Sequence, residues 1–216
     1  MTTAQMYLSK LLQRYPALEV CEAEIQAAYD LLRDCFTGGG KLLVCGNGGS
    51  AADAEHIVGE LMKGFLLKRA LRPPDRATLL TAFPEHGAAL ADHLQYGLPA
   101  IALTGHPALA TAFANDVAGD MVFAQQVFVY GNAHDTALGI STSGNSSNVL
   151  NALRVAKIRG LKTVGLGGAH GGQMRQLCDV LIAVPARATA EVQEYHLPVY
   201  HALCSMLEAT FFGQLA

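Results

Sequence analysis

The sequence is poor in charged residues and has no long apolar run. Only 15% of its 216 residues are charged, 51% are hydrophobic, and the formal net charge is -3. Such a chain has no overall attraction to nucleic acid, although a local basic patch is compatible with this balance. No run reaches the roughly 20 apolar residues that span a bilayer, and the first residues lack the basic-then-apolar pattern of a secretion signal. The composition favours a compact core and some apolar surface buried between subunits.

Cysteine pairs with the spacing of a redox or metal motif are also absent. The cysteines are odd in number, widely separated, and form no CxxC pair: Cys21, Cys35, Cys45, Cys178 and Cys204. This pattern is typical of buried, reduced thiols rather than of a disulfide framework. We therefore expect a reducing environment and a cytoplasmic location.

Short apolar runs alternate with helical patterns along most of the chain. The expected strands are 41–45, 100–104, 136–141, 162–166 and 180–184. The expected helices are 3–36 with a break near Pro16, one carrying His56 and Glu60, then 107–114, 120–130, 146–159, 171–178 and a long final helix over about 189–213. Alternation of this kind indicates an α/β fold, a three-layer sandwich in which helices flank a central, mainly parallel five-stranded sheet.

The stretch 62–99 does not fit this alternation. It carries several basic residues, prolines at 73, 74 and 84, and two histidines. A connection of this length in a compact domain usually has a function or folds locally. We expect it to extend the preceding helix and then form a loop that covers a site or contacts a neighbouring subunit. A plain solvated insertion is the alternative.

Two loops rich in Gly, Ser and Asn, at 46–50 and 141–147, each follow an expected strand and open a helix. Glycine lets the backbone approach a ligand closely, and hydroxyls with free N–H groups at a helix N-terminus suit a phosphate dianion. The first loop is neither the GxGxxG of dinucleotide sites nor a Walker loop, because no lysine follows. Ligands of parallel sheets bind beyond the carboxyl ends of the strands. We therefore predict a phosphorylated small molecule here, with a tight turn and a serine N-cap as the alternatives.

Four side chains further along could form a metal and proton-transfer site. His56 and Glu60 are four residues apart, so they lie on one face of a helix about one turn apart. Gln193 and His201 are eight apart on the final helix, roughly 12 Å along its axis. They reach one ion only if their side chains lean together or if different subunits contribute. The donor set suits zinc or a similar divalent ion, whereas a packed or solvated histidine is the alternative for each imidazole.

Taken together, these segments resemble the phosphoheptose isomerase family. The resemblance is carried by CGNGGSAADAEH from residue 45 with Glu60, by LGISTSGNS from residue 138, by VQEYH from residue 192 with His201, and by Asn115 and Asp116. It spans about residues 40–205 in the family's order. It implies one sugar-isomerase (SIS) domain of flavodoxin-like architecture over 1–216, with an N-terminal helical segment at 1–38.

The resemblance also implies an activity and a site. The expected reaction interconverts sedoheptulose 7-phosphate and D-glycero-D-manno-heptose 7-phosphate in bacterial heptose synthesis, in a homotetramer with sites between subunits. The implied zinc ligands are His56, Glu60, Gln193 and His201. The implied substrate-binding residues are Asn47, Gly48, Gly49, Ser50, Glu60, Asn115, Asp116, Ser141, Thr142, Ser143, Ser146 and Gln193.

For the chemistry, we assign Glu60 as the base that takes a carbon-bound proton and His201 as the acid that serves the oxygen. A carboxylate bound to zinc is a weaker base. Either Glu60 therefore shifts during proton transfer, or the ion mainly organises the site.

The sequence departs from the family pattern in two places, and three other functions are alternatives. The stretch between Glu60 and Asn115 is longer than in typical members, and Glu191 replaces a residue that is often basic. A non-catalytic SIS-domain regulator that binds a partner protein or phosphosugar is one alternative, but such proteins tend to lack the acidic residue at position 60. An isomerase for a different phosphosugar is a second. An amide-transferring enzyme is disfavoured because the sequence shows no glutaminase domain.

Overall fold

The structure, a computed structural model, describes residues 2–213. Its centre is a five-stranded sheet with the order β2-β1-β3-β4-β5, and every neighbouring pair is parallel. The α/β sandwich predicted from the alternating pattern is confirmed. The strands are β1 (Leu42–Gly46), β2 (Ala100–Ala102), β3 (Thr136–Ser141), β4 (Lys162–Gly168) and β5 (Val180–Val184).

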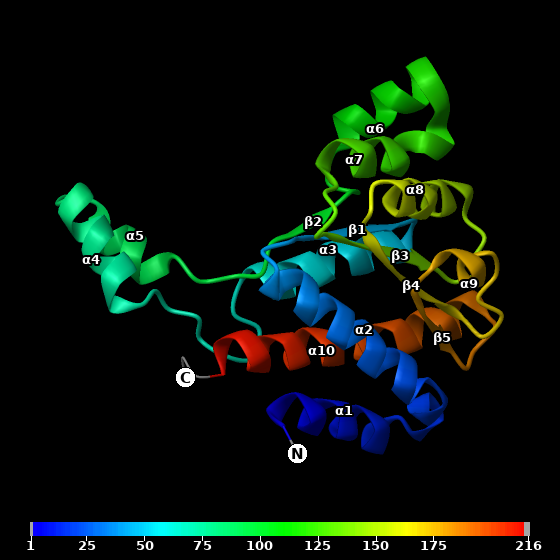
Figure 1. The fold of residues 1–216 in the computed structure, drawn as a ribbon, viewed down its shortest axis with the longest axis horizontal. Coiled ribbons are helices and arrows are strands. Elements are labelled where there is room, and N and C mark those ends of the chain that lie inside the picture. The colour runs from blue at the N-terminus through cyan, green and yellow to red at the C-terminus, as the bar shows by residue number, and fades with distance from the viewer. Residues whose placement is uncertain (1, 214–216) are drawn as a thin grey trace.

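Helices cover both faces of this sheet (Figure 1). The break predicted at Pro16 is confirmed, because a 3₁₀ turn, η1 (Pro16–Cys21), separates the first two helices. The helices are α1 (Thr3–Arg14), α2 (Glu22–Thr37), α3 (Gly49–Met62), α4 (Pro73–Ala82), α5 (Gly87–His93), α6 (Pro107–Phe113), α7 (Val122–Tyr130), α8 (Ser147–Ile158), α9 (Met174–Leu177) and α10 (Thr189–Phe212). Between α6 and α7 lie a π-helical turn, η2 (Ala114–Ala118), and a 3₁₀ turn, η3 (Gly119–Met121). None of the helices within residues 2–213 combines the length and apolar character needed to cross a membrane.

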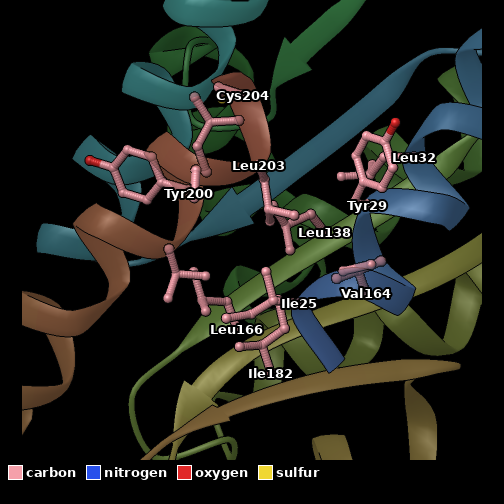
Figure 2. Packing of buried hydrophobic residues seen from close by; sticks show 14 of the residues in the cluster. Ile25, Tyr29, Leu32, Leu138, Val164, Leu166, Ile182, Tyr200, Leu203 and Cys204 are labelled. Atoms are coloured by element: carbon pink, nitrogen blue, oxygen red, sulfur yellow. The ribbon is translucent and has the colours of Figure 1, made fainter. Parts of the chain in front are cut away.

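Two apolar clusters hold the layers together, one on each face of the sheet. On one face, Ile25 and Tyr29 of α2 and Leu203 of α10 pack against Leu138 and Val164 of the sheet (Figure 2). The other cluster joins α7 and α8 to the opposite face of the sheet. Burying one such aliphatic side chain contributes about 1.5–3 kcal/mol relative to leaving it exposed. Strands covered on both faces are continuously apolar, which is why short runs such as β1 could be recognised in the sequence.

The connections diverge at the carboxyl ends of β1 and β3, the edge of the sheet that is here named the crevice. From β1 the chain passes through α3 to β2 on one side, whereas β3 lies on the other side of β1. The helix that follows β1 packs in one apolar cluster and the helix that follows β3 packs in the other. The two loops therefore open onto opposite faces of adjacent strands. This is the topological switch point at which open parallel sheets bind ligands.

The predicted structure of 62–99, an extension of the preceding helix followed by a loop, was wrong. The helix is not extended, because α3 ends at Met62 and the next residue is extended. Instead of a loop, the stretch folds into a hairpin of α4 and α5 that projects away from the sheet (Figure 1). Pro73 and Pro74 start α4, since a first-turn proline loses no helical hydrogen bond. No hydrogen bond within residues 2–213 joins this hairpin to loops 46–50 or 141–147.

Candidate active site

The serine hydroxyls of the serine loop, 141–147, are bonded to one another rather than to the N–H groups of the helix that follows. The Oγ of Ser141 lies 2.9 Å from that of Ser146 and 3.5 Å from that of Ser143. Ser146 is the N-cap residue of α8, yet its side chain makes no capping hydrogen bond. Gly144 turns the loop at φ +67°, where an added Cβ would lie 2.1 Å from the carbonyl oxygen of Gly171. The clustered hydroxyls therefore face one another at a helix N-terminus, as an anion site requires.

The first glycine loop meets the final helix. A Cβ placed on Gly49 would lie 2.5 Å from Nε2 of Gln193, so the amide of Gln193 reaches the loop where glycine leaves room for it. Gly48 caps α3 at φ +55°, and no side chain caps that helix. Neither Ser50 nor Asp53 caps α3. Ser50 is buried, and the carboxylate of Asp53 bonds a tyrosine instead.

The side-chain amides of Asn47 and Asn148 pair with each other and so join the first loop to the start of α8; we name this pair the amide clasp. It was not predicted from the sequence. Nδ2 of Asn47 donates to Oδ1 of Asn148 at 2.9 Å, and Nδ2 of Asn148 donates back to Oδ1 of Asn47 at 2.8 Å. Asn47 follows β1 and Asn148 lies in the first turn of α8, so the clasp spans the crevice. An asparagine beside the serine run was the only signal in the sequence. The partner could not be identified, because the two residues are 101 positions apart.

The predicted acid–base residues converge. Nε2 of His56 lies 3.2 Å from Oε1 of Glu60 and 3.4 Å from Nε2 of His201. Glu60 is well sheltered, with 12% of its side chain exposed, and its second oxygen lies 3.2 Å from Nζ of Lys63. The helices α3 and α10 therefore bring together groups that are about 140 residues apart.

A buried tyrosine orients this cluster. The hydroxyl of Tyr200 donates to Oδ1 of Asp53 at 3.2 Å and lies 3.0 Å from Nδ1 of His56. Because a carboxylate only accepts, the hydroxyl proton goes to Asp53 and His56 donates from Nδ1. The lone pair on Nε2 of His56 then faces Glu60 and His201. Burial, and next the charge of Asp53, raises the pKa of Tyr200 above its usual value, so the hydroxyl keeps its proton.

A shared proton or a cation would relieve the close approach within the two histidine-containing pairs. A lone pair facing a carboxylate oxygen at 3.2 Å is repulsive unless a proton or a metal ion is shared. Burial lowers the pKa of His201, the neighbouring His56 lowers it further, and Glu60 opposes both, which favours neutral imidazole. Two zinc ligands at about 2.1 Å from the ion lie roughly 3.4 Å apart in a tetrahedron.

The donors fit zinc in type and in the spacing of the two measured pairs. No group of three or more His, Cys, Asp or Glu side chains within residues 2–213 is placed to hold a metal ion in the single chain.

Three other residues named from the sequence lie apart from this cluster. No hydrogen bond within residues 2–213 joins Gln193 to His56, Glu60 or His201; it contacts Gly49. Asn115 and Asp116 lie exposed on η2, where Nδ2 of Asn115 donates to Oδ1 of Asp116 at 2.8 Å. The single chain thus brings the two loops together in one cluster and the acid–base groups together in another, and no hydrogen bond within residues 2–213 links either cluster to the Asn-Asp pair.

A buried histidine also belongs to this side of the sheet. His196 of α10 is 0% exposed, between Gln193 and His201 in the sequence. Burial lowers its pKa to about 4, against a smaller opposing effect of the Gly167 backbone. This imidazole is therefore neutral in the folded protein at neutral pH.

Comparisons with known proteins agree on one family. Residues 6–82 and 76–168 match the SIS domain, and the two matches overlap inside the stretch 62–99. The chain is 39% identical over 192 residues to a phosphoheptose isomerase of Burkholderia pseudomallei, covering 89% of this chain and 84% of the relative.

It is 38% identical to a phosphoheptose isomerase of Trichlorobacter lovleyi, covering 98% and 97% of the two chains. The structure of phosphoheptose isomerase GmhA from Neisseria gonorrhoeae matches with a TM-score of 0.72 and 32% identity, over 95% of this chain and 96% of that one.

Proposed function

The chain belongs to the phosphoheptose isomerase family of SIS-domain proteins, and we propose that its crevice carries out that family's reaction. It is an aldose–ketose isomerase that interconverts sedoheptulose 7-phosphate and D-glycero-D-manno-heptose 7-phosphate in bacterial heptose biosynthesis. One observation carries the proposal for the site. A sheltered carboxylate, Glu60, and the imidazoles of His56 and His201 meet between α3 and α10, the two helices whose first turns adjoin at Gly49 and Gln193.

We propose that the serine loop binds the phosphate of the sugar. The hydroxyl of Ser141 lies within 3.5 Å of the hydroxyls of Ser143 and Ser146, at the start of α8. A helix N-terminus favours negative charge, so a dianion can be held there without an arginine. The Asn47–Asn148 clasp fixes the first loop against the serine loop. Anchoring the phosphate restricts where the reacting carbons lie, which lowers the entropic part of the barrier.

Proton transfer is assigned to Glu60 and His201. The carboxylate of Glu60 takes the proton from the carbon next to the carbonyl, and the electrons of that C–H bond form the enediolate. An imidazole N–H of His201 supplies a proton to the carbonyl oxygen. The reverse steps at the adjacent carbon give the isomer, so both groups return to their starting states. General acid–base catalysis of this kind contributes about 10²–10⁴-fold to the rate.

Zinc is part of this proposal. When bound, a divalent ion polarises the substrate carbonyl and stabilises the negative charge that develops on oxygen. His56 and His201 offer neutral imidazole nitrogens and Glu60 offers a carboxylate, and Gln193 would be the fourth protein ligand. Tyr200 would keep the Nε2 lone pair of His56 available, because its hydroxyl oxygen accepts a hydrogen bond from Nδ1–H and so holds the proton on that nitrogen.

We also propose a homotetramer in the cytoplasm, with sites completed between subunits. Exposed apolar side chains on α7, Phe128 at 54% and Val129 at 64%, would be covered by another copy. The exposure of Asn115 and Asp116 suits residues that act at a subunit boundary. The free thiols suit a reducing compartment.

NMR of sedoheptulose 7-phosphate incubated with the protein in D₂O tests the activity. The expected result is conversion to the aldose with deuterium at the carbon that carries the transferred proton. Treatment with EDTA should stop this exchange and added zinc should restore it. A folded, phosphosugar-binding protein that exchanges no deuterium in the presence of zinc would refute the assignment. Full activity after complete chelation would refute the role of zinc and leave the isomerase assignment standing.

A further inference from the structure

An ion pair lies fully buried beside the proposed site. Arg69 and Glu208 are 0% and 1% exposed, and Nε of Arg69 lies 2.9 Å from Oε1 of Glu208. Desolvating two charges is costly, so a buried pair by itself is a weak stabiliser. Every further contact that the pair makes is therefore informative about its role.

Glu208 fixes the segment that follows α3. Its carboxylate accepts the backbone N–H groups of Phe65 at 2.8 Å, Leu66 at 2.7 Å and Leu67 at 3.2 Å. Three successive amides directed at one carboxylate hold this segment in a single conformation. The bonds also explain why the helix stops at Met62, since these N–H groups do not join the α3 ladder.

Arg69 holds the last turn of α3. Nη1 donates to the carbonyl oxygen of Leu61 at 2.6 Å, and Nη2 donates to that of Glu60 at 3.0 Å. Carbonyls in the last helical turn lack partners within the helix, and a cation is favourable there. The guanidinium also stacks at 4.5 Å from the ring centroid of Phe212. The backbone of Glu60 is therefore held by a side chain that is itself anchored on α10.

The same segment reaches the second catalytic group. The ring centroid of Phe65 lies 5.3 Å from that of His201. One ion pair thus acts at both ends, on the Glu60 backbone through Arg69 and on the His201 ring through Phe65.

We propose that Arg69 and Glu208 are positioning residues that set the separation of Glu60 and His201. The inference rests on the proposed roles of those two groups. Arginine is required at position 69 because its planar fork reaches a carboxylate and two carbonyls in different directions, which an ammonium cannot do.

Three variants and a matched control test this proposal. Arg69→Lys keeps the charge, and the paired change Arg69→Met with Glu208→Leu removes both charges so that neither is left buried alone. Phe65→Leu breaks the contact with His201 without touching the pair. The control is Arg76→Met, which removes the exposed Arg76–Asp92 ion pair of the hairpin. For the three test variants we expect kcat to fall about 100-fold with little change in KM, since the serine loop is intact.

NMR signals of the His201 ring in histidine-labelled protein provide a measurement that does not depend on turnover. They should shift in the three test variants, whose circular dichroism stays native, and should not shift in Arg76→Met. Unchanged His201 signals and unchanged kcat in folded Arg69→Lys and Phe65→Leu would overturn the proposal. If the wild-type protein proves inactive on the phosphosugar, shifts confined to the test variants still support the positioning role. The proposed isomerase activity and the proposed positioning role of Arg69 and Glu208 can therefore be refuted independently.

Discussion

The crevice and the α4–α5 hairpin lie on one chain but are built differently. At the crevice, polar groups from several elements bond one another across long sequence separations, as Asn47 does with Asn148. In the hairpin, α4 has no buried residue and α5 buries only Gly87 and Ala91. The first region is held by the packed sheet and the second mainly by itself. The comparison teaches that catalytic geometry here depends on the scaffold, whereas the added segment can vary without disturbing it.

The largest difference in kcat between the two regions is expected when a carboxylate is replaced by an amide. Glu60→Gln should fold and bind phosphosugar yet lose about 10³-fold in kcat, because an amide cannot take the substrate proton. The matched control is Glu85→Gln, which neutralises an exposed glutamate of the hairpin. Deuterium incorporation and turnover of sedoheptulose 7-phosphate measure both. Near-normal turnover in Glu60→Gln would remove this residue as the base.

The sequence predicted the strands and loops of the crevice better than it predicted the hairpin, for physical reasons. Strands buried on both faces leave continuous apolar runs, and β3 and β5 were placed at their observed bounds. The hairpin has no core-facing stripe to impose a helical period, and its prolines did not reveal that two of them begin α4.

Partner choice was the other part that the sequence could not supply. Tyr200, Asn148, Arg69 and Glu208 act through contacts that tertiary packing decides. Their residue types alone gave no local sign of a role. The loops and the acid–base residues, by contrast, stood out because each sits directly after an apolar strand or at helical spacing.

A smaller difference is expected in the response of stability to pH. His196 has its pKa lowered to about 4 in the folded state, whereas an unfolded histidine binds a proton below about 6.5. Its stabilising contribution is therefore complete above pH 6.5 and is lost as the pH falls toward 4, by about 3 kcal/mol in total. Urea unfolding at pH 7 and pH 4 measures the change.

Variants at two histidines separate this effect from general acid sensitivity. His196→Leu should lose less stability between pH 7 and pH 4 than the wild type. His86→Leu, which removes an exposed histidine of the hairpin, should follow the wild-type profile. Parallel profiles for all three proteins would contradict the assignment.

The smallest effect is expected from removing the hairpin. Ala70 and Gln95 pair in an antiparallel bridge, so the two ends of the insertion already meet. Replacing 72–94 by a short Gly-Ser linker should leave kcat and KM unchanged and shift the free energy of unfolding by about 1 kcal/mol or less. Steady-state kinetics and urea unfolding measure this. A large loss of kcat would mean that the hairpin belongs to the site, and the contrast between the two regions would fail.

Helix α10 supplies His201, Tyr200 and Glu208, and each depends on a partner made much earlier in the chain. On the ribosome, the sheet can therefore collapse before the reaction centre exists. Until α10 emerges, Glu60 has neither its imidazole partner nor the carboxylate that organises the segment after it. A nascent chain stalled before this helix should carry an exposed apolar face and no turnover, so synthesis order itself delays the chemistry until α10 has been made.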